Sequence, residues 1–331
     1  MAKQGDLSAY TQVMTQFGQD TDKKVRQYAA EAALSFADNL AEQGDLSGYQ
    51  QVIAQFGQDT DYEVRQYAVK AAFGLAENLA KQGDWSAYTQ AITQFGQDED
   101  KKVRLRAAES ALSLAFNLSK KQGDFSGYSQ IVAQFGQDKH NPIRLQAAQA
   151  AFNLALELDK QGDLSAYEQV VAQFGRDKHN ETRLRAAKAA YILAKALYKQ
   201  NPDPDVFLPA IQQFANDSAA SIRKAVFHHG TMNRINWLVV VGRQQEAQEE
   251  IAAALKSRYC GVPERAVLRF LLWLSDPNAA NQAACRKAVN ALKGKKPENW
   301  IFVEFAELIA GMLSEQQQFA NEIIALLEER S

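Results

Sequence analysis

The side chains that most often bind metals or act as catalysts are few in this chain, and their spacing matches no familiar site. His140 and His179 stand in the same string, Asp-Lys-His-Asn. This repetition indicates a loop or helix-capping position, with a ligand pair joining two repeats as the alternative. His228 and His229 are adjacent, so on a helix they point in different directions and cannot form the i, i+4 pair of a helical zinc site.

The two cysteines, Cys260 and Cys285, are too few for a disulfide framework, and their spacing fits no zinc motif. We expect both thiols to be reduced and partly buried. The sequence also lacks a phosphate-binding loop and the strings GxGxxG, GxSxG, HExxH and paired CxxC. These observations predict no metal, no cofactor and no catalytic residue.

One series of arginines is the most regular charged feature, since an arginine recurs at the same place in each unit of 39 or 40 residues. The series is Arg26, Arg65, Arg104, Arg144, Arg183 and Arg223. An arginine in the first turn of a helix opposes the helix dipole, so we expect each to pair with the aspartate six residues before it, as Arg26 with Asp20. The alternative is a row of cations that binds an anionic partner.

A tyrosine series has the same period and is predicted to be structural. It consists of Tyr10, Tyr49, Tyr88, Tyr128 and Tyr167. We expect these rings to pack in the interior with the hydroxyl hydrogen-bonded.

Both series belong to a tandem repeat. Gln-Gly-Asp begins at Gln4, Gln43, Gln82, Gln122 and Gln161, at spacings of 39, 39, 40 and 39 residues. Each unit reads as two helices, for example from about residue 22 to 42 and from about 46 to 56, because apolar residues recur at helical period. Gly44 is a natural helix stop, and Asp45 is a natural N-cap for the short helix that follows. Asp59 or Asp61 is predicted to cap the next long helix. Alanine-rich long helices favour close stacking of neighbouring hairpins.

The strings VRxxAAxAxxxxAxxLAxQGD and YxQVxAQFGxD resemble tetratricopeptide-type repeats of the longer bacterial variety, over about residues 1–260. The resemblance implies an all-α, right-handed superhelical solenoid of helix-turn-helix repeats that binds a peptide or protein in a concave groove, usually without catalysis. An alanine-rich stack of the HEAT type is the alternative.

The repeat predicts two regions. Residues 1–243 hold about six repeats and begin within one, so we expect an uncapped apolar face there. Two alternatives follow from it: self-association through this face, or a native chain that extends further upstream. Residues 244–331 are predicted to form degenerate repeats or a helical C-terminal cap. The helical segments expected there lie near 262–275, 277–293, 297–313 and 314–330.

Positions that vary between copies are the candidates for partner binding. Residues 34 and 38 of the first long helix lie 140° and 180° from the core stripe, and the resemblance places that side in the inner groove. The predicted groove residues are Phe73, Glu77, Leu112, Phe116, Phe152, Leu156, Tyr191 and Lys195. An apolar patch in mid-groove is typical of a partner site. The alternative is that these residues pack between helices.

The predicted function is therefore a protein-interaction scaffold that binds a partner peptide or helix in its groove. A dedicated inhibitor or immunity-type protein that masks one toxin or enzyme is the alternative. A third hypothesis is an enzyme with a site within 224–331, although nothing in the spacing supports it. Its candidate residues are Arg243, Glu264, Arg265 and Glu304.

Charge and hydropathy predict which partners are absent. The net charge of −2 gives no global attraction for nucleic acid. No window approaches 18 consecutive apolar residues, so we expect no membrane span. The start of the chain has no apolar leader, and we therefore expect a cytoplasmic protein.

Overall fold

The computed structural model describes the chain except for residues 1–11, 13, 202–203, 294–304 and 330–331, and all of its regular elements are helices. The described residues contain no strand. The chain divides into two compact units, residues 1–185 and 186–331. The expected division at residue 243 therefore falls inside the second unit.

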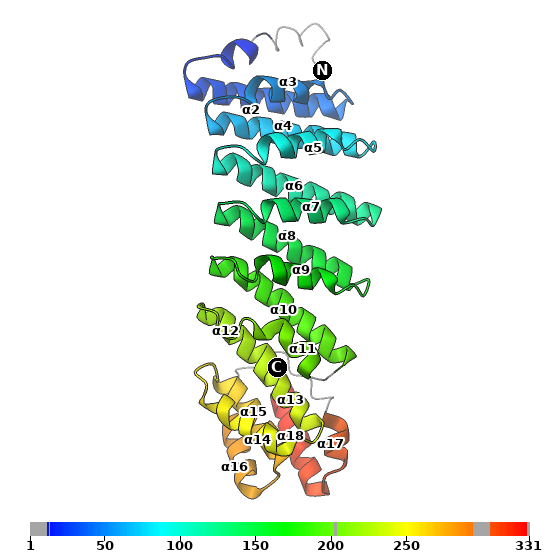
Figure 1. Cartoon of the computed structure of the whole chain (residues 1–331), viewed down its shortest axis with the longest axis vertical. Helices are drawn as coiled ribbons and strands as arrows, with labels where there is room; N and C mark the ends of the chain where they lie inside the picture. Colours follow the sequence, from blue (N-terminus) through cyan, green and yellow to red (C-terminus); the bar gives the residue numbers. More distant parts are fainter. Residues whose placement is uncertain (1–11, 13, 202–203, 294–304, 330–331) are drawn as a thin grey trace. The chain divides into compact units, whose positions relative to one another are not determined.

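The first unit is an α-solenoid of stacked helical hairpins (Figure 1). Its long helices are α2 (Lys23–Glu42), α4 (Tyr62–Ala80), α6 (Lys101–Gln122) and α8 (Asn141–Asp159). Its short helices are α3 (Ser47–Phe56), α5 (Ser86–Phe95), α7 (Ser126–Phe135) and α9 (Ser165–Phe174). Successive long helices from α2 to α8 pack on one another, and α3, α5 and α7 each lie against the long helices before and after them. The long and short helices therefore form two layers.

The helix boundaries follow from local capping. Asp22 accepts a hydrogen bond from the amide of Lys24, and Asp61 does the same for the amide of Glu63. Gly44 adopts a φ of 85°, a conformation that glycine tolerates better than other residues. The prediction that Gly44 follows the end of α2 is confirmed, and Asp61, rather than Asp59, is the N-cap of α4. The predicted N-cap Asp45 is wrong, because Leu46 holds that position in α3.

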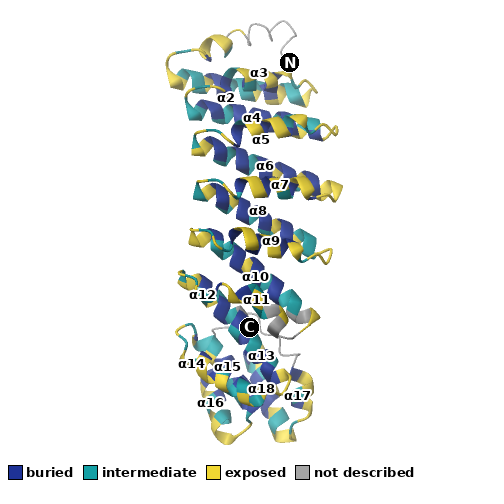
Figure 2. Ribbon diagram, in the orientation of Figure 1, coloured by how far each residue is buried: buried dark blue, intermediate teal, exposed yellow. Residues whose placement is uncertain are grey.

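The core of the first unit lies between the two layers. A Phe-Gly pair ends each short helix, and its phenylalanine is at most 1% exposed in Phe56, Phe95, Phe135 and Phe174. Phe17, which precedes Gly18 in the first copy, is 45% exposed. In Figure 2 the buried residues lie mainly in the central stretches of the long helices, while the turns are mostly exposed. Small side chains such as Ala68 and Ala107 allow the helices to pack closely on one another, and both are 0% exposed.

The second unit continues with helices of less regular length. Helix α10 (Asn180–Gln200) spans the division between the units. Beyond it lie α11 (Pro204–Gln212), α12 (Ala220–Val226), the π-helical turn η1 (Phe227–Thr231), α13 (Met232–Val240), α14 (Gln244–Lys256), α15 (Val262–Ser275), α16 (Ala279–Asn290), α17 (Ala306–Ala310) and α18 (Ser314–Glu329). The helices predicted near 262–275, 277–293 and 314–330 are thus present. The one predicted near 297–313 falls largely outside the described residues.

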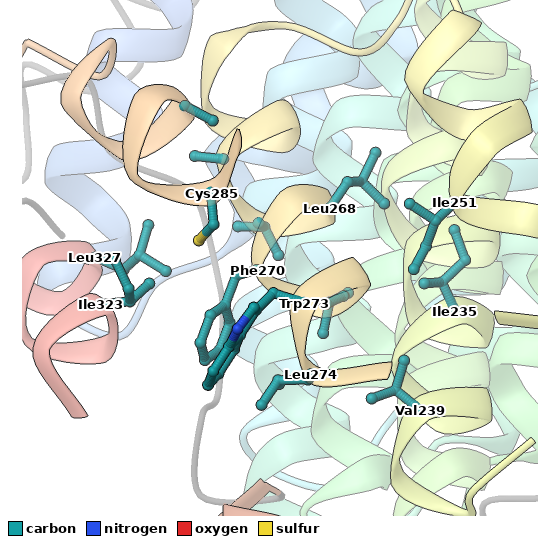
Figure 3. Packing of buried hydrophobic residues seen from close by; sticks show 14 of the residues in the cluster. Ile235, Val239, Ile251, Leu268, Phe270, Trp273, Leu274, Cys285, Ile323 and Leu327 are labelled. Carbon is teal, nitrogen blue, oxygen red and sulfur yellow. The ribbon is translucent and has the colours of Figure 1, made fainter. Parts of the chain in front are cut away.

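Larger apolar side chains fill the core of the second unit. Trp273 and Phe270 pack together with ring centroids 6.2 Å apart, and Trp273 also contacts Phe319 edge-on at 4.6 Å. Figure 3 shows these two neighbouring rings of α15 with Ile323 and Cys285 around them. The cluster has members from Phe227 to Leu327, so the C-terminal helices share one hydrophobic core.

Candidate partner-binding groove

The arginine series joins successive hairpins. The Nε and Nη2 atoms of Arg65 donate to both carboxylate oxygens of Asp98, at 2.9 and 2.8 Å. Its Nη1 donates to the backbone carbonyl of Asp59 at 2.7 Å. The same pattern links Arg26 to Asp59, Arg104 to Asp138 and Arg144 to Asp177.

The predicted partner of these arginines was therefore wrong. The aspartate six residues earlier contributes its carbonyl oxygen, while the carboxylate comes from the next hairpin. The pairs are largely buried: the side chains of Arg104 and Asp138 are 6% and 9% exposed. Since bidentate pairs of this kind are short and directional, we describe these as inter-hairpin clamps. Their burial and pairing leave no open track of cations in the described part of the array.

The tyrosine series is structural, as predicted. The Tyr88 hydroxyl donates to the carbonyl of Ala111 at 2.7 Å, and the Tyr128 hydroxyl donates to that of Ala150 at 3.1 Å. The Tyr49 hydroxyl donates to the Asp38 carboxylate at 2.7 Å. Burial raises the pKa of Tyr88, so the hydroxyl stays protonated and able to donate. Tyr10 lies outside the described residues.

Several predicted groove residues lie between the layers. Phe73 and Leu112 are each 6% exposed. Phe73 meets the ring of Tyr88 edge-on at 6.1 Å, and half-buried Phe116 lies 5.5 Å from the ring of Tyr128. These contacts show how the side chains serve the array: they pack a long helix against the short helix that follows it.

The other predicted groove residues are more open. Glu77 is exposed and pairs with Lys81 at 3.1 Å, and Leu156 is 37% exposed. Phe152 is half-buried. Tyr191 and Lys195 are also half-buried, and they belong to the second unit.

A groove in the first unit lies in the layer of short helices, between α5 and α7. It has a volume of about 420 Å³. Its floor is α6, through Ala115 and Ser119, and its walls include Trp85 and Ile131. The remaining lining residues are Tyr88, Thr89, Ile92, Thr93, Gln122, Asp124, Ser126, Gly127, Tyr128, Gln130 and Gln134. The groove therefore combines aromatic and aliphatic surface with neutral polar groups and the carboxylate of Asp124.

Sequence reasoning missed this groove because it followed only the long helices. A signal was present in the short ones: Trp85 stands where other copies have Leu46 or Phe125. Thr93 likewise stands where the neighbouring copies have Ala54 and Ala133, and where the next has Ala172. In addition, the single 40-residue spacing adds its residue within α6, the floor of the groove.

The histidines and cysteines form no metal site in the described part of the chain. No group of three or more His, Cys, Asp and Glu side chains there could hold a metal ion. His140 occupies the N-cap position of α8, but its side chain makes no capping hydrogen bond. Cys260 and Cys285 are free and buried, and burial raises the pKa of Cys285 to about 12.

Two of the residues considered for an enzyme pair with other side chains. Arg243 pairs with Glu246 at 2.5 Å, whereas Glu264 lies 3.5 Å from His228. Glu304 is outside the described residues. Among the helices that the structure describes, none combines the length and apolar character needed to cross a membrane.

Comparison with known proteins adds no functional assignment. No family model matches the chain, and no curated protein matches it either. Two crystal structures of engineered proteins resemble it at 17% and 14% identity. The alignment with the first covers 74% of this chain and 97% of the engineered protein, with a TM-score of 0.35. The alignment with the second covers 97% of this chain and 98% of the engineered protein, with a TM-score of 0.39. At these values, neither contributes to the functional argument.

Proposed function

We propose that the chain is a protein-interaction scaffold that binds a partner peptide in the groove between α5 and α7. The observation that carries this proposal is the open groove itself, with Trp85 on one wall and small residues on its floor. Pockets of a few hundred Å³ that mix apolar walls with a few polar groups are typical of ligand sites. Tryptophan is also enriched among the residues that dominate binding energy.

The composition of the groove favours an extended peptide with apolar anchor residues. Half-buried Trp85 lines the groove together with Ile92 and offers surface for an apolar side chain. Gln130 and Gln134 can donate to and accept from a peptide backbone. Asp124 is the one charged side chain among the described residues that line the groove, so a strongly acidic peptide is disfavoured.

A library of random peptides displayed on phage tests the proposal. Peptides would be selected on the full chain, and their affinity measured by fluorescence anisotropy. The blocking variant is Thr93→Arg, which places a long side chain at an exposed position of the groove wall. We expect it to weaken binding at least tenfold, about 1.4 kcal/mol.

The matched control is Ala172→Arg, at the equivalent exposed position of α9. We expect this variant to bind like the unmodified chain. Both variants should melt within a few degrees of it, because both positions are exposed. Equal affinity of the selected peptides for both variants would refute the groove as the binding site.

A further inference from the structure

The last arginine of the series, Arg223, lacks the carboxylate that every clamp described above contains. Its Nη1 donates to the carbonyls of Asp217 and Ser218, as in the other hairpins. Its Nε, however, donates to the hydroxyl of Tyr259 at 2.9 Å. The Nη2 atom has no protein acceptor among the described residues. In the other clamps, Nε and Nη2 of the arginine bind two carboxylate oxygens. Of these two atoms in Arg223, only Nε has a partner among the described residues, and that partner is the neutral hydroxyl oxygen of Tyr259.

Ser257 occupies the place of the missing aspartate. In the clamp, the amide of Asp59 donates to the carbonyl of Phe56, and its Oδ1 accepts from the amide of Asp61 at 2.8 Å. Ser257 repeats both features: its amide donates to the carbonyl of Ala254, and its Oγ accepts from the amide of Tyr259 at 3.2 Å. Because a serine hydroxyl is shorter and uncharged, this junction has the backbone of a clamp without its anion.

A second cation converges on the same hydroxyl. The Nη2 atom of Arg258 donates to the Tyr259 hydroxyl at 2.8 Å, and its guanidinium lies 5.0 Å from the ring centre. The hydroxyl thus accepts two hydrogen bonds, while its own hydrogen has no acceptor among the described residues. Burial alone raises the pKa of Tyr259, but the hydrogen bonds from Arg223 and Arg258 outweigh it and lower the pKa. The surroundings of this hydroxyl therefore favour negative charge.

We propose that Arg223, Arg258 and Tyr259 form a binding site for a carboxylate of a partner polypeptide. The carboxylate would accept hydrogen bonds from Nη2 of Arg223, from Arg258 and from the Tyr259 hydroxyl. This is the ligand that the fold itself supplies to Arg26, Arg65, Arg104 and Arg144. Arginine suits it, because its planar fork matches the geometry of a carboxylate. The site lies wholly within the second unit and does not depend on the groove between α5 and α7.

Three short glycine peptides and inorganic phosphate provide the probes, and the first two peptides are blocked at both ends with a single variable central residue. One carries aspartate, a second carries asparagine as the neutral isostere, and a third has no acidic side chain but a free C-terminal carboxylate. Inorganic phosphate is the fourth probe. Binding to the full chain would be followed by NMR through the side-chain N–H signals of Arg223 and Arg258, at low salt, because screening weakens exposed charge pairs.

We expect saturable binding of a carboxylate peptide and none of the asparagine peptide. The tighter of the two carboxylate peptides identifies the source as a side chain or a chain terminus. Binding of phosphate alone, or equal binding of the aspartate and asparagine peptides, would overturn the proposal.

Three variants separate the site from its surroundings. Ser257→Asp supplies the missing carboxylate within the chain, so it should abolish peptide binding and raise the melting temperature. Ser257→Ala leaves the position without an anion and should bind as before. Arg258→Gln, at an exposed position, should weaken binding about tenfold, the effect of one charge-assisted hydrogen bond. Unchanged affinity in both Ser257→Asp and Arg258→Gln would contradict the assignment, whereas the groove variant Thr93→Arg should leave it intact.

Discussion

At the scale of single residues, the clamps set the register between hairpins. Each buried arginine bonds backward to carbonyls of its own hairpin and forward to a carboxylate of the next. A buried guanidinium is costly unless it is fully paired. The bidentate pairing is satisfied when adjacent hairpins stack in this register, so we expect the clamp to favour that register.

Replacing one clamp arginine should destabilise the array strongly. Arg104→Ala leaves the carboxylate of Asp138 buried without its partner, and we expect a loss of about 3–5 kcal/mol in the free energy of unfolding. Urea denaturation followed by circular dichroism measures it. The control is Arg106→Ala on the same helix, whose side chain is 42% exposed and pairs with Glu109 at 3.5 Å. Its loss should stay below about 1 kcal/mol, as for exposed ion pairs. Similar losses in the two variants would show that the clamp is unimportant.

At the scale of helices, the sequence predicted what depends on neighbouring residues in the chain. Helix α2 begins and ends within a residue of the predicted boundaries. Its ends depend on nearby residues, since Asp22 caps its first turn and Gly44 allows the chain to turn after it. The carboxylate partner of each arginine was not predictable in this way, since Asp59 and Asp98 reach it only after the hairpins stack. Nor was the groove between α5 and α7, because a long helix packs on two long neighbours and on short helices, so its helical phase alone does not identify an open side.

The glycine that ends a long helix should be sensitive to substitution even though it has room. Gly83 has a φ of 89°, and an added Cβ would meet nothing within 4 Å. Gly83→Ala should therefore cost about 1 kcal/mol through backbone strain alone. Gly127→Ala is the matched control, because Gly127 is open too but lies within α7 at an ordinary φ. There alanine should stabilise the protein by up to about 1 kcal/mol. Thermal denaturation compares the two, and equal shifts would contradict this explanation.

At the scale of the whole molecule, the clamps make the stability of the first unit depend on pH. Burial raises the pKa values of Asp138 and Asp177, but the hydrogen bonds from Arg104 and Arg144 and from the amides of His140 and His179 outweigh it. The pKa of each carboxyl therefore lies below its usual value near 3.8. A carboxyl whose pKa is depressed on folding stabilises the protein above its unfolded pKa. This contribution is lost as the pH falls through the folded value.

We therefore expect the free energy of unfolding to decline below about pH 4 through these two groups, with no contribution to the slope from them near neutrality. Urea denaturation across a pH series measures this decline. Asp138→Asn should be less stable at neutral pH and show a shallower decline in acid, because one of the titrating groups has been removed. An unchanged slope in this variant would contradict the assigned role of Asp138.

The clamp has a further consequence for how such an array can change in length. Each hairpin presents an arginine on one side and an aspartate on the other, so every internal unit has the same pair of connectors. Duplicating or deleting one whole hairpin would leave each remaining arginine opposite an aspartate, and no buried charge would lose its partner. The array is thus modular, in that recombination between copies can alter its span while its junctions stay intact.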